Sequence, residues 1–289
     1  MRILPRKFLL IAAALLLSTP LTAQQLNLKH SICFGDSLTH NDILGLVNFL
    51  PQDMYGMDPF EAMWEKGKPA NATLNRYAIA GSRSQHLWAQ ITAYELAELF
   101  GLAPSGTCFQ VEIGGNDFFS NDFVLGANPP GTNAKADAVV DDLLDRIHNT
   151  VTYLGLRRPS TEIILWTVPD ITLTPSRWHF TPQQKANIRA HLQRANRKIM
   201  SYNNHPRVAV LDFYKLHHYV VQNLPTLNGT TLVGPPAHGK YHYLHADDVH
   251  PTAVGNGYIA NALADALNKK FGSNIPMYSD AELAALAHL

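Results

Sequence analysis

Short apolar runs rich in β-branched and aromatic residues recur along the chain, and longer segments with a helical repeat lie between them. Each run ends at a glycine, a proline, an aspartate or another polar residue typical of turns, so the runs predict buried β-strands. The five predicted strands are Ser31–Phe34, Leu74–Ile79, Cys108–Ile113, Ile163–Val168 and Val208–Phe213.

The intervening segments predict α-helices. In Pro182–Asn203 the apolar residues recur three or four positions apart and therefore share one face of a helix: Ile188, Leu192, Ala195 and Ile199. In Ala253–Phe271 they repeat every four positions, and Gly272 provides a stop signal. Ser84–Phe100 and Ala134–Leu154 are further predicted helices.

Strands that alternate with helices predict an α/β fold, in which helices cover both faces of a parallel sheet. Such sheets place their ligand site at the carboxyl ends of the strands. We interpret the polar stretches Ser120–Asn133 and Pro225–Ala246 as long loops. The tail Ser279–Leu289, rich in Ala and Leu, can form an additional helix.

The first residues have the pattern of a secretory signal peptide. Basic residues precede the ten-residue apolar run Phe8–Leu17, and a segment with small residues follows and ends at Ala23. The alternative, a membrane anchor, needs about 20 residues to cross about 30 Å of hydrocarbon, which is more than this run supplies. We therefore expect cleavage near Ala23, a single domain over residues 24–289, and a secreted or periplasmic protein.

The charge of the chain argues against some kinds of partner. It has 23 basic and 23 acidic residues and a formal net charge of zero. Proteins that bind nucleic acids or anionic membranes depend on a basic excess. We expect a monomer that acts on a small molecule, with no nucleic-acid partner and no transmembrane segment after the signal peptide.

Four polar segments follow predicted strands or precede the last predicted helix. They are Gly35–Thr39 (GDSLT), Ala80–Ser82 (AGS), Gly114–Asp117 (GGND) and Asp247–Thr252 (DDVHPT). Because ligand sites in parallel sheets lie at the carboxyl ends of the strands, we expect these segments to come together in one site.

Ser37 is the candidate nucleophile. Serine is a poor nucleophile at neutral pH and needs an adjacent base, which His250 can supply. Pro251 favours an extended backbone at His250, and Asp247 can hold the second ring nitrogen. The plainer interpretation of Ser37 alone is a helix N-cap, and only its combination with the other segments favours catalysis.

N–H groups can stabilise the negative charge that develops on an attacked ester carbonyl. The candidates are the backbone N–H groups of Ser37 and Gly81 and the side-chain amide of Asn116. Gly81 has no Cβ and permits a close approach. Gly81 and Asn116 can also be simple turn residues, and we interpret the neighbouring Asp117 as structural.

Together and in this order, the four segments resemble the signature blocks of the SGNH (GDSL) esterase and lipase family. The resemblance implies a three-layer α/β/α sandwich with a five-stranded parallel sheet, as in flavodoxin-like folds. It also implies acyl-ester hydrolysis with these site residues: Ser37, Asp247, His250, Gly81 and Asn116. With the signal peptide, we expect a secreted esterase or lipase that needs no cofactor and no metal. One departure is His40, where many relatives carry an acidic residue.

Other functions stay open at this point: a carbohydrate O-deacetylase, an acyltransferase, or a non-catalytic lipid- or carbohydrate-binding module. A metal hydrolase is a further alternative, because five potential ligands lie within thirteen residues: His238, His242, His245, Asp247 and His250. No pair of histidines has the HExxH spacing, so we interpret this cluster as a polar rim of the site.

Export would allow Cys33 and Cys108 to form a disulfide. If the family's strand order applies, their strands are neighbours. Aligning the strand ends at Gly35 and Gly114 then offsets the cysteines by four residues, or about 13 Å at about 3.3 Å per residue. We therefore expect two free thiols.

Substrate choice is expected to reside in the two long loops, because the candidate catalytic groups address only the ester carbonyl. The apolar residues of these loops are Phe123, Val124, Leu125, Leu227, Leu232, Val233, Tyr241 and Tyr243. If they face Ser37, they favour a moderately apolar acyl chain. In the alternative, they only attach the loops to the domain.

Overall fold

The computed structural model describes residues 26–39 and 56–289. Its centre is a five-stranded parallel sheet with the strand order β2-β1-β3-β4-β5, which confirms the predicted fold class. The strands are β1 (His30–Gly35), β2 (Thr73–Arg76), β3 (Cys108–Glu112), β4 (Glu162–Trp166) and β5 (Val208–Leu211). The predicted signal peptide and His40 lie outside the described residues.

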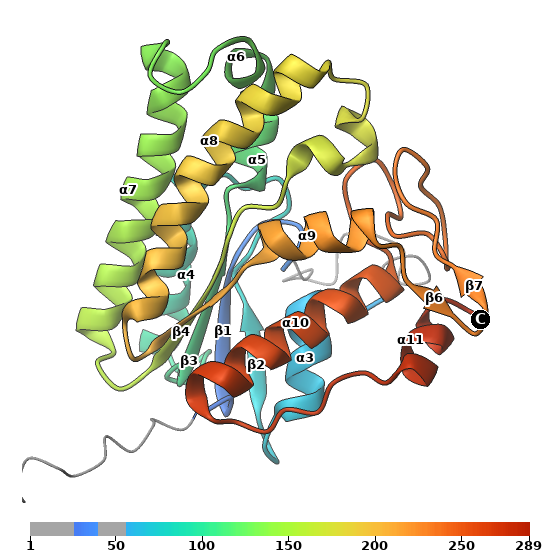
Figure 1. The fold of residues 1–289 in the computed structure, drawn as a ribbon. Coiled ribbons are helices and arrows are strands. Elements are labelled where there is room, and N and C mark those ends of the chain that lie inside the picture. Colours follow the sequence, from blue (N-terminus) through green and yellow to red (C-terminus); the bar gives the residue numbers. More distant parts are fainter. Residues whose placement is uncertain (1–25, 40–55) are drawn as a thin grey trace, which may run out of the picture.

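Helices cover both faces of the sheet and make three layers (Figure 1). One face carries α4 (Leu87–Leu99), α7 (Ala134–Arg157) and α8 (Pro182–Ser201). The other face carries α3 (Pro59–Gly67), α9 (Phe213–Gln222) and α10 (Ala253–Phe271). The arrangement is the three-layer sandwich that the sequence predicted.

Each face of the sheet has its own hydrophobic core, because successive side chains of a strand point to opposite faces. Ile32 and Phe34 of β1 join the core beneath α4, α7 and α8, whereas Cys33 joins the core beneath α3 and α10. β3 repeats the pattern, with Phe109 on the first face and Cys108 on the second. The strands β3, β4 and β5 are fully buried and mainly apolar, because both of their faces are covered.

The ends of the long helices follow their sequence signals. At the start of α8, Thr181 Oγ1 accepts the Gln184 N–H at 3.2 Å, and Gln184 Oε1 accepts the Thr181 N–H at 3.0 Å. These two reciprocal bonds form a capping box. α10 stops before Gly272, whose φ of 64° lies in the left-handed region that favours glycine. The tail forms the expected helix, α11 (Asp280–Leu286).

The prediction of the first long loop is partly wrong. The stretch Ser120–Asn133 contains α6 (Asp122–Ala127), which follows directly on α5 (Gly115–Phe119). Leu125 is fully buried in the core beneath α7 and α8, and Val124 packs against the same core, so two apolar residues hold a short helix whose composition is otherwise typical of a loop. Helices α3 and α9 were not predicted either.

The second predicted loop, Pro225–Ala246, is largely a loop. It contains a short antiparallel pair, β6 (Thr226–Leu227) and β7 (Thr230–Thr231). Leu232 of this loop is buried in a third apolar cluster that also includes residues of α11. The loop is therefore attached to the C-terminal part of the domain.

The strand register corrects the predicted offset of the cysteines. Gly35 pairs with Glu112 and not with Gly114, so Cys33 and Cys108 are offset by two residues instead of four. The prediction placed the end of β3 at Gly114, but the strand ends two residues earlier. Both cysteines are buried and have free thiols, as expected.

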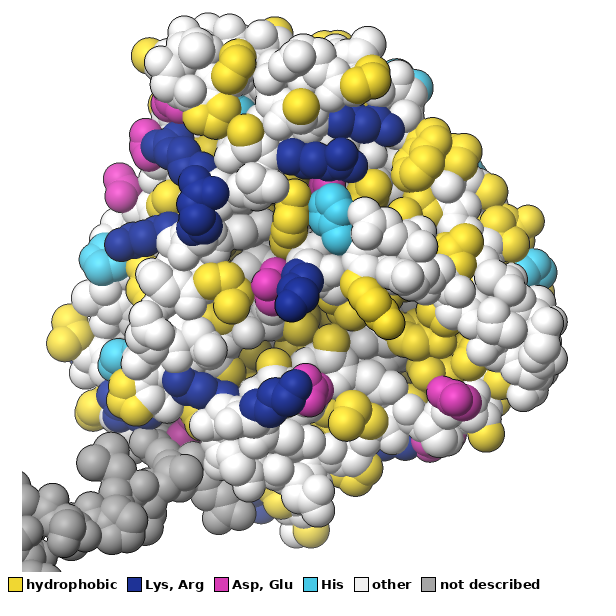
Figure 2. Space-filling view, in the orientation of Figure 1, with side chains coloured by type: hydrophobic (Ala, Val, Ile, Leu, Met, Phe, Trp, Pro, Cys, Tyr) yellow, Lys and Arg dark blue, Asp and Glu magenta, His cyan; other side chains and the backbone are white. Residues whose placement is uncertain are grey.

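The surface carries charges of both signs. Figure 2 shows basic side chains along α8 beside acidic side chains on α7. Arg194 of α8 forms ion pairs with Asp137 and Asp141 of α7, which accounts for part of this pattern. In the described part of the chain, no helix combines the length and the apolar character needed to cross a membrane.

Candidate active site

The turn that carries Ser37 begins at Gly35, the last residue of β1. Gly35 has a φ of 152°, and a Cβ there would lie 2.1 Å from the backbone oxygen of Glu112, so a larger residue does not fit. The chain then turns, and the Thr39 N–H donates to the Asp36 carbonyl at 3.2 Å. This turn places Ser37, half-buried, at the carboxyl end of the sheet.

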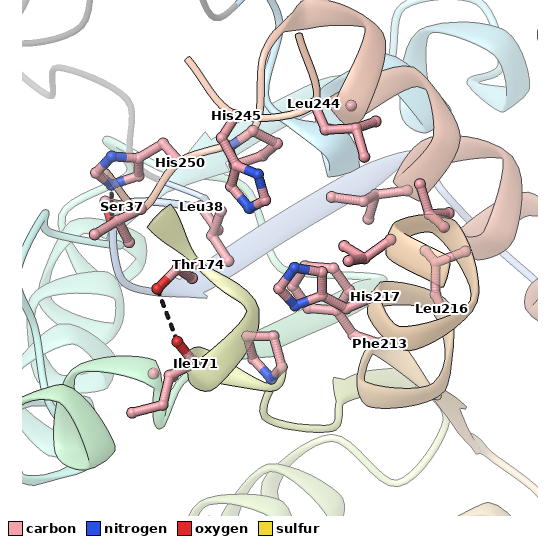
Figure 3. A pocket seen from close by; sticks show the side chains of 18 of the residues that line it. Ser37, Leu38, Ile171, Thr174, Phe213, Leu216, His217, Leu244, His245 and His250 are labelled. Carbon is pink, nitrogen blue, oxygen red and sulfur yellow. Dashed lines mark hydrogen bonds between the residues drawn. The ribbon is translucent and has the colours of Figure 1, made fainter. Parts of the chain in front are cut away.

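Ser37, His250 and Asp247 form a continuous chain of hydrogen bonds. Ser37 Oγ lies 2.9 Å from His250 Nε2 (Figure 3), and His250 Nδ1 lies 2.8 Å from Asp247 Oδ2. When the proton is on Nδ1, the imidazole donates to Asp247 and accepts from Ser37. The structure thus brings together three residues that the sequence placed up to 213 positions apart.

Asp247 is held as a carboxylate. Its Oδ1 accepts the N–H groups of Val249 at 2.7 Å and His250 at 2.6 Å. Burial acts to raise the pKa of Asp247, but the hydrogen bonds from the His250 ring and from these backbone groups outweigh burial and hold the pKa well below its usual range. Asp247 is therefore ionised at neutral pH and can stabilise a protonated His250.

The loop that carries His250 is fixed at its base. His245 and Pro251 form an antiparallel bridge across the loop. Directly afterwards, Thr252 caps α10 by accepting the Gly255 N–H at 3.3 Å. His250 therefore stands on a loop immediately before a helix, as the sequence predicted from Pro251.

Asn116 lies in the first turn of α5, just beyond the end of β3. Its Nδ2 donates to Asp36 Oδ2 and to the Ser82 carbonyl, each at 3.1 Å. These bonds join the turns that follow β1, β2 and β3. Gly81, next to Ser82, has a φ of 76° and open space where a Cβ would lie, so a substrate can approach its backbone. The four predicted segments therefore meet at one edge of the sheet.

Gln90 of α4 holds two of these turns together, although the sequence did not single it out. It is only 2% exposed. Its Oε1 accepts the Gly35 N–H at 2.8 Å, and its Nε2 donates to the Gly35 carbonyl at 2.8 Å and to Ser82 Oγ at 3.1 Å. Its main partners are backbone atoms 55 positions away, and a lone glutamine in a helix carries no sequence signal for such contacts.

Two carboxyl groups, Asp36 and Glu112, are buried next to each other beneath the Ser37 turn. Burial and the negative charge of Asp36 raise the pKa of Glu112 well above its usual value. Burial also raises the pKa of Asp36, so the two carboxyl groups share a hydrogen bond, and Asp36 in turn accepts from Asn116. The sequence analysis missed Glu112, although a glutamate inside an apolar strand is itself a signal of a buried polar contact.

Asp117 has partners of its own. Its carboxylate accepts the Ser84 N–H at 2.9 Å and the Ser84 hydroxyl at 2.6 Å. These bonds connect α5 to the segment that leads into α4. They agree with the interpretation of Asp117 as a structural residue.

A comparison with protein families identifies the kind of enzyme. The model of GDSL-like lipases and acylhydrolases matches residues 32–263, which is most of the chain. The chain belongs to this family. It is therefore a carboxylic ester hydrolase of the GDSL type, as the four sequence segments indicated. A comparison with curated protein sequences gave no match.

Solved structures of esterases and lipases share the fold of this GDSL hydrolase. An acetylxylan esterase from Geobacillus stearothermophilus has a TM-score of 0.53 and 16% identity over 89% of this chain and 99% of its own. A lipase from a goat rumen metagenome has a TM-score of 0.53 and 16% identity over 82% and 96%. An extracellular lipase from Streptomyces rimosus has a TM-score of 0.50 and 15% identity over 82% and 99%. At such identities the likeness shows the fold alone.

Beside Ser37 the GDSL hydrolase has a cavity with mainly apolar walls (Figure 3). Ser37, Asn116 and His250 are among its lining residues. Its apolar lining includes Phe213, Leu216, Val220 and Val221 of α9, and Tyr258 and Ile259 of α10. Helix α9, which the sequence analysis did not predict, therefore supplies a large part of the cavity.

The cavity corrects the prediction about the two long loops. Within the described residues, none of the apolar side chains assigned to substrate choice lines it. Leu232 is 1% exposed and packs with Leu227 and Val254, whereas Phe123 is largely exposed. The buried residues of this set attach their loops to the domain, as the alternative interpretation expects, and the second loop contributes to the cavity through Leu244 and His245 instead.

The histidine-rich segment does not form one cluster. Among residues 26–39 and 56–289, no group of three or more His, Cys, Asp or Glu side chains is placed to hold a metal ion. His250 bonds to Ser37, His245 lines the cavity, and His238 Nε2 lies 3.5 Å from Asp248 Oδ1. His245 and His250 thus line the same cavity, whereas His238 lies beside Asp248.

Proposed function

We propose that this GDSL hydrolase cleaves carboxylic esters with Ser37 as nucleophile, His250 as base and Asp247 as the group that orients His250. The observation that carries the proposal is the hydrogen-bond chain from Asp247 through His250 to Ser37, with distances of 2.8 and 2.9 Å, at the wall of an apolar cavity. Such an arrangement is the geometry by which a serine hydroxyl is activated.

In the first half of the reaction, His250 Nε2 takes the proton of the Ser37 hydroxyl as Oγ attacks the ester carbonyl. The ionised Asp247 stabilises the imidazolium that forms. His250 then gives its proton to the departing alcohol, and the acyl group stays on Oγ. In the second half, His250 takes a proton from water as the water attacks the acyl-enzyme, and it returns this proton to Ser37 Oγ as the acid is released.

We assign the stabilisation of the negative charge on the carbonyl oxygen to three hydrogen-bond donors. They are the backbone N–H groups of Ser37 and Gly81 and the Nδ2 amide of Asn116. Both N–H groups of Asn116 have partners in the free site, Asp36 and the Ser82 carbonyl. Asn116 can keep the charge-assisted bond to Asp36 and exchange the neutral bond to Ser82 for one to the oxyanion. Asp36 thus orients the Asn116 amide. The oxyanion of the substrate takes the place of the Ser82 carbonyl, which the amide contacts in the free site.

The cavity supports substrates with an apolar acyl chain. An acetyl group would leave most of its apolar wall unused, whereas each further buried CH₂ contributes about 0.8 kcal/mol, or roughly fourfold in kcat/KM. We therefore place the acyl chain in the cavity and the alcohol outside it. A carbohydrate O-deacetylase and an acyltransferase remain alternatives that use the same catalytic groups.

The test is hydrolysis of p-nitrophenyl esters from acetate to palmitate. We expect kcat/KM to rise with chain length until the cavity is filled, and Ser37→Ala to remove nearly all of this activity. Ser201→Ala, at the exposed end of α8, is the matched control and should behave as the wild type. Full activity of Ser37→Ala would refute the proposed nucleophile, and a preference for acetate would favour a deacetylase.

We further propose that the mature protein is exported and consists of one domain, residues 24–289. The support is the charged, apolar and small-residue order of residues 1–23, which is typical of a signal peptide. N-terminal sequencing of the protein from the periplasm or the medium is the test, and the expected first residue is Gln24. Recovery of the uncleaved chain in the cytoplasm would contradict it.

A further inference from the structure

Two histidines outside the proposed triad line the same cavity as Ser37. His217 comes from α9, and His245 comes from the loop that leads to Asp247 (Figure 3). Their ring centroids are 5.6 Å apart. His217 also stacks on Phe213, one turn earlier in α9, with ring centroids 6.1 Å apart and an interplanar angle of 24°. Two imidazoles therefore interrupt an otherwise apolar wall.

Both imidazoles are uncharged at neutral pH. Burial lowers the pKa of His217 to about 4, although the negative charge of Asp170 acts against the shift. Burial and the neighbouring His217 lower the pKa of His245 to about 3, against the opposing charge of Asp247. Each ring therefore carries one N–H and one lone pair, and the cavity wall has no cationic group at these positions.

The hydrogen-bond pattern indicates which nitrogen carries the proton. The Nδ1 atoms of His217 and His245 are buried and have no partner among the described residues. A buried N–H without an acceptor is rarer and more costly than a buried acceptor without a donor. The proton therefore belongs on Nε2 of each ring, and the cavity wall offers two neutral N–H donors.

An unsubstituted alkyl chain would fill the cavity but leave both donors without an acceptor. A buried polar group that loses its partner weakens binding by roughly tenfold. A site built to hydrogen-bond a substrate atom discriminates strongly against analogues that lack it. A carboxylate would also be unsuitable, because it would be desolvated without a positive partner. The wall therefore fits an uncharged oxygen within an otherwise apolar chain.

We propose that the cavity selects esters whose acyl chain carries an uncharged oxygen, such as an ether, hydroxyl or ketone, which accepts hydrogen bonds from His217 and His245. This inference deepens the proposed function and rests on the placement of the acyl chain in the cavity. It assigns the two histidines to substrate selection and not to the chemical step.

The test compares p-nitrophenyl octanoate with its 4-oxa, 5-oxa and 6-oxa analogues, in which an ether oxygen replaces one CH₂ at a time. In a wall without donors, every oxygen lowers kcat/KM, since it is desolvated and gains no bond. With both donors present, we expect kcat/KM of the analogue with the oxygen at one position to exceed that of octanoate by roughly three- to tenfold. The wild-type enzyme alone decides the question. A decrease at every position would overturn the proposal.

Variants then assign the effect to the histidines. His217→Phe and His245→Phe keep a ring but remove the N–H, so each should abolish the advantage of the favoured oxygen and raise kcat/KM for octanoate. His217→Gln keeps a donor and should retain part of the advantage. An unchanged ratio of oxa-ester to octanoate in both Phe variants would contradict the assignment. Thermal melting confirms that each variant is folded.

The outcomes separate this inference from the proposed function. If Ser37→Ala is inactive and the oxa-esters show no favoured position, ester hydrolysis by Ser37 stands and only the role of the histidines is refuted. If Ser37→Ala keeps full activity, the proposed function itself fails. A faster reaction with the p-nitrophenyl hemiester of suberic acid than with octanoate would also overturn the inference, because neutral donors should not favour an anion.

Discussion

Gln90 is expected to stabilise the fold and the catalytic geometry at the same time. It connects α4 to the end of β1 through both the N–H and the carbonyl of Gly35, and to the turn after β2 through Ser82. Ser37 and Gly81 lie on these two turns. Gln90→Met removes all three bonds but nearly preserves the volume of the side chain.

The magnitude follows from the partners that remain. The Gly35 carbonyl keeps the bond from the Ile79 N–H at 3.2 Å, but the Gly35 N–H is left buried without an acceptor. An unpaired buried N–H costs about 1–3 kcal/mol, and the lost bond to Ser82 adds about 1 kcal/mol. We expect the free energy of unfolding to fall by about 3 kcal/mol, which lowers the Tm by roughly 6–12 °C.

Urea denaturation followed by circular dichroism measures the first effect, and kcat on the preferred p-nitrophenyl ester measures the second. We expect kcat to fall roughly tenfold or more, since the nucleophile and an oxyanion donor lose a shared support. Gln222→Met, at the exposed end of α9, is the matched control and should change stability by less than about 0.5 kcal/mol. If both variants lose the same stability, the reasoning about Gln90 is wrong.

Three further outcomes are expected. In Asp247→Asn, the side-chain oxygen still accepts the two backbone N–H groups, but the NH₂ group faces His250 Nδ1 and can no longer accept its proton. We expect kcat to fall roughly 10²–10⁴-fold while the circular dichroism spectrum is unchanged. A loss of less than tenfold would contradict the role of Asp247. Burial acts to raise the pKa of Asp170, but His218 and Arg189 outweigh burial and hold it well below its usual range. Its stabilising effect is therefore complete above about pH 4 and disappears as the pH falls below that value. In urea titrations at acid pH, the free energy of unfolding should fall less steeply with falling pH in Asp170→Asn than in the wild type. Parallel curves of this free energy against pH would refute the reasoning. Burial and the negative charge of Asp36 raise the pKa of Glu112 in the folded protein, so the unfolded state ionises first and the wild type loses stability as the pH rises above the unfolded value of about 4.3. Glu112→Gln should therefore become more stable relative to the wild type as the pH rises above that value, and a pH-independent difference between the two would contradict the raised pKa.

The sequence predicted the parts of this protein that depend on local pattern. Strands buried on both faces appear as apolar runs, and a long amphipathic helix such as α8 shows its buried stripe and its capping box. The residues of the proposed site follow strand ends or precede a helix, where their positions relative to the sheet can be inferred. For this reason Ser37, Asn116 and His250 were found without the structure.

Other features depend on contacts between distant residues and left little trace in the sequence. Helix α9 mixes histidine, tyrosine and lysine with its apolar positions, because part of it faces a cavity instead of a packed core. The offset of Cys33 and Cys108 depends on where β3 ends. The end of β3 is set by its pairing with β1, which the composition of the strand does not reveal. The apolar residues of the long loops could face either the site or the domain, and the buried position of Leu232 shows the second arrangement.

The central claim is that the Ser37 hydroxyl, activated by His250, is the nucleophile. A fluorophosphonate tests it directly, because an activated serine attacks the phosphorus, forms an Oγ–P bond and expels fluoride. We expect mass spectrometry to find one phosphonyl group per chain on the peptide that contains Ser37, with ester hydrolysis lost in proportion to labelling. Ser37→Ala should not be labelled, and His250→Ala should react far more slowly. Full labelling with hydrolysis retained, or equal labelling of Ser37→Ala, would contradict the account.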